Sequence, residues 1–124
     1  MSDRRRLPAP GATYSQAVVV DVGEARWIYV AGQTPNEPVP EDLRSQSERC
    51  FAQIEAILVE CGAGLADVVQ ITVYLTDLSN FGEFSEVRGR VFGSEPPSSA
   101  AVGVASLLGD VLVEISAVAI AQSR

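Results

Sequence analysis

The chain of 124 residues has no lysine and no histidine. Without histidine, no Ser-His or Cys-His nucleophile pair can form within the chain. The net charge of −7 argues against a nucleic-acid partner, because phosphate binding needs clustered cations. The basic cluster Arg4-Arg5-Arg6 is interpreted as part of a polar, flexible N-terminal segment over residues 1–11 rather than as a binding arm.

Cysteine is scarce, with Cys50 and Cys61 placed in one predicted helix. Eleven residues of helix separate their Cα atoms by roughly 16 Å, whereas a disulfide needs less than about 7 Å. We therefore expect two small buried side chains, no metal site and no cofactor. No apolar run approaches the roughly 18 residues that span a bilayer, and no leader pattern is present. We expect no membrane partner and a cytoplasmic location.

Hydrophobic periodicity predicts one α+β domain over residues 1–124. Strands are predicted over 14–22, 26–33, 68–75, 100–105 and 111–121, and helices over 41–61 and about 80–92. The order is ββαβαββ, with the two amphipathic helices packed on one face of a sheet.

Both faces of the predicted inner strands are largely apolar. In the strand over 68–75, we expect Val69, Ile71, Val73 and Leu75 on one face, and Val68, Thr72 and Tyr74 on the other. Two helices cover only one face, and an uncovered apolar face costs free energy at roughly 25 cal/mol per Å². The simplest cover is another copy of the chain, so we expect an obligate homo-oligomer.

Several short motifs occur in a characteristic order. They are Tyr14-Ser15-Gln16-Ala17, Ala31-Gly32-Gln33-Thr34-Pro35, Thr72-Val73-Tyr74-Leu75-Thr76-Asp77-Leu78, Pro96-Pro97-Ser98-Ser99 and Leu112-Val113-Glu114-Ile115. Together they resemble the Rid family of YjgF/RidA-like proteins, over nearly the whole chain. The resemblance implies a chorismate mutase-like fold, a homotrimer with a central barrel, and small-molecule clefts between subunits. The best-known members hydrolyse reactive imines and enamines.

The resemblance also implies which residues carry the chemistry. Glu114 stands at the position of a glutamate that positions the attacking water, so it is the candidate catalytic residue. Ser99, or Ser98 after a slip of one residue, stands where the deaminases carry an arginine that grips the substrate carboxylate. One hydroxyl cannot replace a bidentate guanidinium, which predicts loss of the standard 2-imino acid activity. A cation from elsewhere, such as Arg26 or Arg88 of a neighbouring subunit, is the alternative.

Each candidate also has a plainer interpretation. The ligand-binding positions that the resemblance implies are Tyr14, Gly32, Ser85, Ser98, Ser99 and Ala101. Glu114 is either a cleft residue or a carboxylate held by backbone donors, and Tyr14 either closes the cleft or packs on the sheet. Ser98 and Ser99 either bind a ligand or fill the space of the arginine, and Ser85 is either near the cleft or an exposed helix residue. Gly32 is expected to allow close backbone approach.

Two classes of function remain open. The first is a Rid-like hydrolase for a different substrate, using Glu114 as acid or base. The second is a non-catalytic trimer that senses a metabolite or binds a partner protein. A ribonuclease fits poorly with the acidic charge and the missing histidine.

Overall fold

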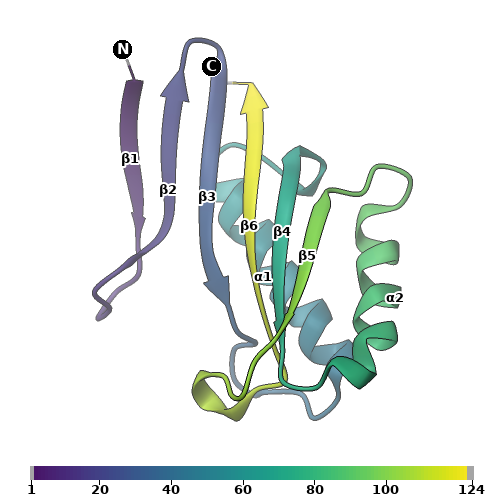
Figure 1. The fold of residues 1–124 in the computed structure, drawn as a ribbon. Coiled ribbons are helices and arrows are strands. Elements are labelled where there is room, and N and C mark those ends of the chain that lie inside the picture. The colour runs from purple at the N-terminus through teal and green to yellow at the C-terminus, as the bar shows by residue number, and fades with distance from the viewer. Residues whose placement is uncertain (1, 123–124) are drawn as a thin grey trace.

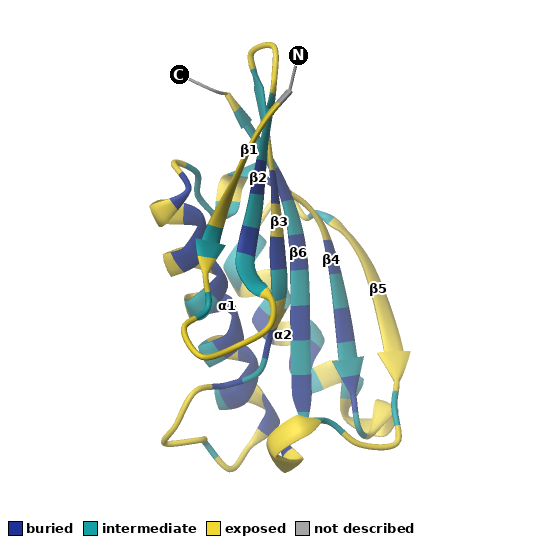
Figure 2. Ribbon diagram, turned by 90° about the vertical axis from the view of Figure 1, so that its left-hand side faces the viewer, coloured by how far each residue is buried: buried dark blue, intermediate teal, exposed yellow. Residues whose placement is uncertain are grey.

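One sheet of six strands, in the order β1-β2-β3-β6-β4-β5, organises the computed structural model, which describes residues 2–122. The strands are β1 (Ser2–Pro8), β2 (Ser15–Val22), β3 (Ala25–Gln33), β4 (Val68–Leu75), β5 (Ser98–Gly103) and β6 (Val113–Gln122). Neighbouring strands run antiparallel except β4 and β5, which are parallel. Helices α1 (Leu43–Glu60) and α2 (Phe81–Phe92) lie on one face of the sheet, as the sequence predicts (Figures 1 and 2).

The boundaries of α1 follow from its caps. Asp42 accepts a hydrogen bond from the backbone N–H of Ser45 at 2.9 Å, which satisfies one of the free donors of the first turn. After the C-cap residue Cys61, Gly62 takes a left-handed φ of +83° and ends the helix. The last turn contains no basic residue, but Arg26 of β3 donates to the Cys61 carbonyl at 3.2 Å.

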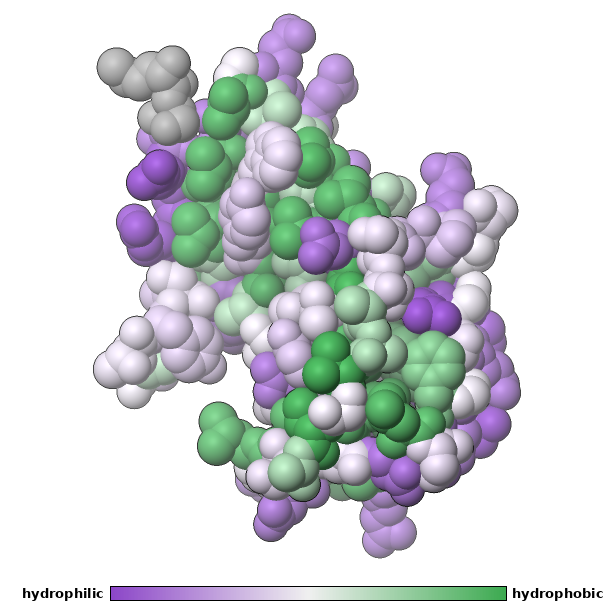
Figure 3. All heavy atoms as spheres, viewed as in Figure 1, coloured by the Kyte–Doolittle hydropathy of each residue, from purple (hydrophilic) through white to green (hydrophobic). Residues whose placement is uncertain are grey.

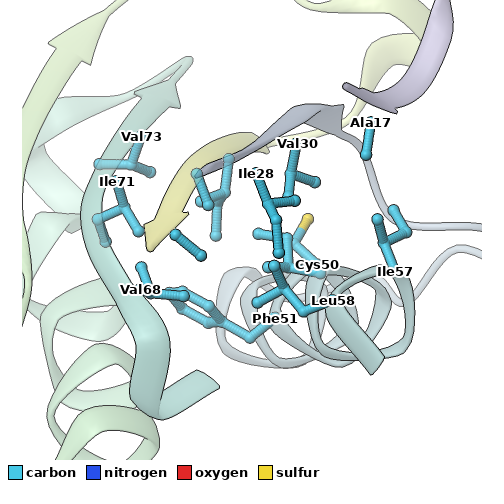
Figure 4. Close-up of a cluster of buried hydrophobic side chains, with 14 of the residues drawn as sticks. Ala17, Ile28, Val30, Cys50, Phe51, Ile57, Leu58, Val68, Ile71 and Val73 are labelled. Carbon is cyan, nitrogen blue, oxygen red and sulfur yellow. The ribbon is translucent and has the colours of Figure 1, made fainter. Parts of the chain in front are cut away.

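The core lies between the two helices and the covered face of the sheet. Phe51 of α1 is 2% exposed and packs on two rings of α2, with ring centroids 6.0 Å from Phe84 and 5.5 Å from Phe92. Figure 4 shows Phe51 and its neighbours on α1 pointing towards Ile28, Ile71 and Val73 of the sheet. Cys50 and Cys61 are both buried and free, as predicted.

A β-bulge in β4 corrects the predicted faces of that strand. Val68 pairs with Ala119, but the next register partner of β6, Val118, pairs with Gln70, so Val69 is the extra residue. The bulge turns Val68 into the core beside Ile71 and leaves Val69 44% exposed. The prediction that Val69 shares the buried face was therefore wrong, because period-two alternation ignores an inserted residue.

The predicted flexible segment over residues 1–11 is also wrong for most of its length, although Met1 lies outside the described residues. Ser2–Pro8 forms β1, which pairs antiparallel with β2 at the edge of the sheet. Arg5 reaches Asp21 at 3.3 Å, and Leu7 packs against the core. An edge strand needs only backbone partners on one side, so its polar side chains did not indicate a strand.

Asp21 of β2 links β1, β3 and, through Arg26, the end of α1, on the side of the sheet that the helices cover. Its carboxylate accepts from Arg26 at 2.8 and 3.1 Å, and Arg26 in turn binds the end of α1. The hydrogen bond from Arg26 is the main reason that the pKa of Asp21 lies below its usual 3.8.

This lowered pKa predicts a pH-dependent contribution to stability. A carboxyl group with a depressed folded-state pKa stabilises the fold above its unfolded pKa, and loses that contribution as the pH falls through the folded pKa. We therefore expect Asp21→Asn to be less stable than the parent in urea unfolding at pH 7, with the difference shrinking below about pH 4. The matched control is Glu55→Gln, an exposed acid on α1. Equal stability of Asp21→Asn and the parent at pH 7 would contradict the prediction.

The other face of the sheet carries no helix and is rich in apolar side chains. Trp27 and Tyr29 of β3 are 39% and 44% exposed and stack with ring centroids 6.4 Å apart. Figure 3 shows hydrophobic side chains gathered on this face over β2, β3 and β6. A hollow of about 590 Å³ lies there, lined by Arg4, Arg6, Val18, Val20, Val22, Trp27 and Tyr29. None of the predicted site residues lines it. We call this side the open face.

Candidate functional site

Glu114 lies on the open face near the start of β6. It pairs with Tyr74 of β4, and its carboxylate extends over Gly32 at the end of β3. A Cβ atom added at Gly32 would collide with Oε2 of Glu114, so the glycine is what makes room for the carboxylate. The side chain is half-buried, and among residues 2–122 it has no hydrogen-bond or ion-pair partner. Within one protomer, therefore, backbone donors do not hold Glu114, and the alternative of donors near a subunit boundary stays a prediction.

A network of glutamine amides holds the backbone beside Gly32. Gln33 is 6% exposed, and its amide donates to Gln16 of β2 and to the Ala31 carbonyl, each at 3.1 Å. Gln53 of α1 donates to Gln33 at 3.2 Å and to the Thr34 carbonyl at 2.9 Å. Buried amides satisfied in this way fix their surroundings in one arrangement. The network therefore sets the position of the Gly32 backbone under Glu114.

A second buried glutamine, Gln46, holds the chain just before β6. Gln46 of α1 is 4% exposed, accepts from the N–H of Leu112 at 2.8 Å, and donates to the Pro40 carbonyl at 2.8 Å. Leu112 lies two residues before Glu114. The bond therefore fixes the chain where it enters β6.

The buried Cys50 of α1, which contacts Gln33, does not add a nucleophile. Its thiol contacts the Gln33 carbonyl at 3.3 Å. Burial, with a smaller contribution from the charge of Glu114, raises the pKa of Cys50 to about 12. The thiol is therefore protonated and unreactive at neutral pH.

A separate polar cluster lies between α2 and the edge strand β5, and Arg88 is its centre. The Arg88 guanidinium donates to Oγ of Ser99 at 2.9 Å and to Oγ of Ser85 at 3.3 Å. Its Cζ atom lies 5.4 Å from the ring centroids of both Phe81 and Phe84. We call Ser85, Arg88 and Ser99 the α2–β5 cluster. The structure thus places a guanidinium beside the serine that stands where the resemblance implies an arginine.

Two other predicted positions on β5 differ in what they do. Ser98 is exposed, and its hydroxyl donates to the Val69 carbonyl at 3.1 Å, which ties β5 to the bulge of β4. Ala101 is exposed and lies two residues after Ser99, on the same face of the strand. Ser98 therefore has a structural partner, whereas Ala101 is a small exposed side chain.

Within one protomer, Ser99 and Glu114 do not share a cleft. Ser99 pairs with Ile71, whose side chain points into the core on the helix side, and Ser99 itself contacts α2. Glu114 and its partner Tyr74 point to the open face. Tyr14 is 60% exposed, in the turn before β2. Glu114 with Gly32, and Ser99 with Ser85, therefore form two separate groups, one on each side of the sheet.

No donor set for a metal ion occurs in the described part of the chain, residues 2–122, where no three acidic or cysteine side chains come together. Neither α1 nor α2 has the length and apolar character needed to cross a bilayer.

Reasoning from the sequence missed two kinds of residue. The buried glutamines had a signal, because Gln16 and Gln33 occur in the quoted motifs, but periodicity does not reveal a buried amide. Arg88 was considered only as a residue from a neighbouring subunit. It lies three residues after Ser85 on α2, and helical spacing places such residues on one face. That spacing was the available signal for the contact.

Comparison with known proteins agrees with the motifs. The family model described as endoribonuclease L-PSP matches residues 4–121. A RutC family protein of Pyrococcus abyssi is 43% identical over 119 residues, which cover 92% of this chain and 91% of the relative. TdcF of Escherichia coli, whose name proposes that it is a reactive intermediate deaminase, is 33% identical over 119 residues. The match covers 90% of this chain and 91% of TdcF.

A solved structure gives the same result for the fold. The crystal structure of RidA from an Antarctic Psychrobacter species superposes with a TM-score of 0.78 at 38% sequence identity, covering 92% of this chain and 93% of that one. Fold, motifs and sequence similarity thus agree over nearly the whole length. The chain belongs to the endoribonuclease L-PSP family, the group of RutC, YjgF and RidA proteins.

Proposed function

We propose that the chain forms a homotrimer that binds a small metabolite in clefts between subunits, and that it hydrolyses an imine or enamine there with Glu114 holding the attacking water. The observation that carries the chemical part is the half-buried Glu114 carboxylate, which has no hydrogen-bond or ion-pair partner within residues 2–122. A carboxylate in such a position is able to orient a water molecule and accept its proton.

Assembly is supported by what the isolated chain leaves uncovered. The open face exposes Trp27 and Tyr29, and every residue of the edge strand β5 is exposed. Apolar faces and unpaired strand edges are regularly covered by another subunit. A second copy is also the simplest way to complete a site whose two groups lie on opposite sides of one sheet. The trimeric number comes from the Rid resemblance.

The proposed reaction consumes one water. The water oxygen bonds to the imine carbon while its proton passes through Glu114 to the nitrogen, and ammonia leaves as the carbonyl forms. An enamine enters the same route after a proton reaches its carbon. No metal or cofactor is required for this sequence of steps.

Two measurements test the proposal. Light scattering after size exclusion is expected to give three times the chain mass of 13.2 kDa. Ammonia release is then followed for 2-iminopropanoate, which carries a carboxylate, and for ethanimine, which does not, each generated in situ by an oxidase. We expect catalysis of at least one of them, and a decrease of about 10²–10⁴-fold in Glu114→Gln.

The controls separate chemistry from binding. Glu83→Gln, which changes an acid of α2 that is paired with Arg44, is expected to keep full activity. A trimer that binds ligand but hydrolyses neither imine would reject the hydrolase and favour the metabolite-sensing alternative. The prediction from Ser99 that 2-imino acid activity is lost remains a prediction, which the 2-iminopropanoate assay addresses.

A further inference from the structure

Three hydroxyl-bearing side chains stand beside Glu114 on the open face, and they carry an inference that rests on the function proposed above. They are Thr72 and Tyr74 of β4 and Ser116 of β6, and we call them the hydroxyl cluster. We propose that the hydroxyl cluster binds the substrate on which Glu114 acts, and that this substrate is a small uncharged imine or enamine that carries a hydroxyl group.

The register of β4 with β6 places the cluster and Glu114 on one face of the sheet. Tyr74 is the cross-strand partner of Glu114, and Thr72 is the partner of Ser116. Cross-strand partners share a face, and so do residues two apart along one strand. The residues between them are buried on the helix side, as the alternating burial of both strands in Figure 2 shows. The four side chains therefore form two adjacent rows, roughly 7 Å apart along the strands.

These four side chains have no partner in the part of the chain that the structure describes. Each is half-buried, and within residues 2–122 neither the Glu114 carboxylate nor any of the three hydroxyl groups takes part in a hydrogen bond or ion pair. A single unpaired hydroxyl on a protein surface bonds to water and indicates nothing. Three hydroxyls and a carboxylate at consecutive paired positions form a set of free donors and acceptors that one small molecule can fill.

The hydroxyl cluster also interrupts an apolar surface. Along the same face, β6 continues from Ser116 to Val118 and Ile120, and the neighbouring β3 places Trp27 beside Ile120. If another copy of the chain covers the open face, as proposed above, an apolar side chain at Ser116 would be covered without loss. A hydroxyl that is covered without a partner costs free energy. A ligand that supplies the partners removes that cost.

The charges near the cluster decide the class of substrate. The arginines that line the hollow of the open face are Arg4 and Arg6 of β1, which is three strand spacings, roughly 14 Å, from β6. Within one protomer, Arg88 contacts Ser99 on the helix side. A substrate carboxylate would therefore meet the Glu114 carboxylate with only neutral groups beside it, and like charges repel. A substrate hydroxyl both donates and accepts hydrogen bonds, as the side chains of the cluster do.

The kinetic experiment compares two imines that differ by one hydroxyl group. A flavin-dependent amine oxidase generates ethanimine from ethylamine and 2-hydroxyethanimine from ethanolamine, and ammonia release is followed. We expect the native kcat/KM to be at least about tenfold higher for 2-hydroxyethanimine, because a site built to bind a hydroxyl rejects the analogue that lacks it. Tyr74→Phe and Thr72→Val are each expected to reduce this preference by about threefold or more. The matched control is Tyr29→Phe on the same face, which pairs with Val118 and is expected to keep the preference.

A binding experiment separates the ligand class from hydrolysis. Titration of the assembled protein with glycolamide, acetamide and glycolate, followed by NMR, changes the hydroxyl group and the charge one at a time. We expect glycolamide to bind most tightly, with acetamide at least about tenfold weaker because it lacks the hydroxyl group. Ser116→Ala is expected to bring glycolamide and acetamide closer together.

Each outcome supports or overturns the inference. Equal native kcat/KM for the two imines, or an unchanged preference in Tyr74→Phe and Thr72→Val with thermal unfolding like that of the parent, would overturn the hydroxyl cluster and leave the role of Glu114 intact. Tighter binding of glycolate than of glycolamide would overturn the uncharged class and show that a partner copy supplies a cation. Preference for glycolamide over acetamide without hydrolysis of either imine would support the ligand class and reject the proposed hydrolase. Neither binding at millimolar concentration nor hydrolysis would overturn both.

Discussion

Replacing Phe51 with alanine is expected to lower the free energy of unfolding by about 3–5 kcal/mol. Phe51 is 2% exposed and contacts rings of α2 at two positions, so its removal leaves a cavity where α1, α2 and the sheet meet. The edge-to-face contact with Phe92 is lost as well. Since small domains are stable by about 5–15 kcal/mol, this is a large part of the total.

The measurement is urea unfolding followed by circular dichroism, at one fixed protein concentration because the proposed assembly would contribute to apparent stability. Val59→Ala is the control, since Val59 lies on the same helix and is 64% exposed. We expect the control to change stability by less than about 0.5 kcal/mol. A loss below about 1 kcal/mol for Phe51→Ala would mean that the packing around this ring is looser than described.

Gly32→Ala is expected to abolish most imine hydrolysis while leaving the fold intact. The added methyl group meets Cδ of Glu114 at 3.0 Å and Cγ at 3.3 Å, and it collides with Oε2. These atoms belong to the end of a flexible side chain, so the side chain rotates away and the backbone stays in place. The rate is expected to fall at least tenfold, towards that of Glu114→Gln, while the free energy of unfolding changes by less than about 1 kcal/mol.

The double variant makes this prediction sharper. If Gly32 acts by positioning Glu114, Gly32→Ala combined with Glu114→Gln is expected to be no slower than Glu114→Gln alone. Gly82→Ala is the matched control, because a Cβ at Gly82 of α2 meets nothing within 4 Å. Additive losses in the double variant, or an unchanged rate in Gly32→Ala, would show that the glycine does not position the carboxylate.

The fold could be predicted where the sequence alternates between solvent-exposed and buried positions. The three-to-four spacing of Phe51, Ile54 and Leu58 indicates the buried face of α1, and the structure buries all three. The strand over Val68–Leu75 was predicted with the bounds that the structure has. These features depend on burial, which hydrophobic periodicity reports directly.

Features that depend on backbone pairing were not predictable in this way. The inserted Val69 changes which face of the sheet the next residues occupy, and its side chain is as apolar as that of Val68 beside it. In β1, Arg4 and Arg6 lie along the open face, so the strand has almost no apolar pattern. Only its register with β2 identifies it as part of the sheet.

The candidate site shows the same division. The motifs and the family resemblance identified Glu114, Gly32, Ser85 and Ser99 as candidates, but a motif does not show which residues of other elements contact them. The contact between Arg88 and Ser99 joins a helix to a strand 11 residues later, and it depends on how α2 packs beside β5. The absence of an arginine from β5 therefore did not reveal that a guanidinium from α2 lies beside Ser99.

The register of the sheet also bears on how the protein can be engineered. Ser2 pairs with Val22, Val22 with Ala25, and Ala25 with Gln122, so the two ends of the described chain stand level across β1, β2, β3 and β6 (Figure 1). Three strand spacings separate them by roughly 14 Å. A short flexible linker spans that gap, which makes circular permutants and tandem fusions of several copies practical. In a tandem fusion each copy carries its own mutations, so one copy can be altered while the others stay native.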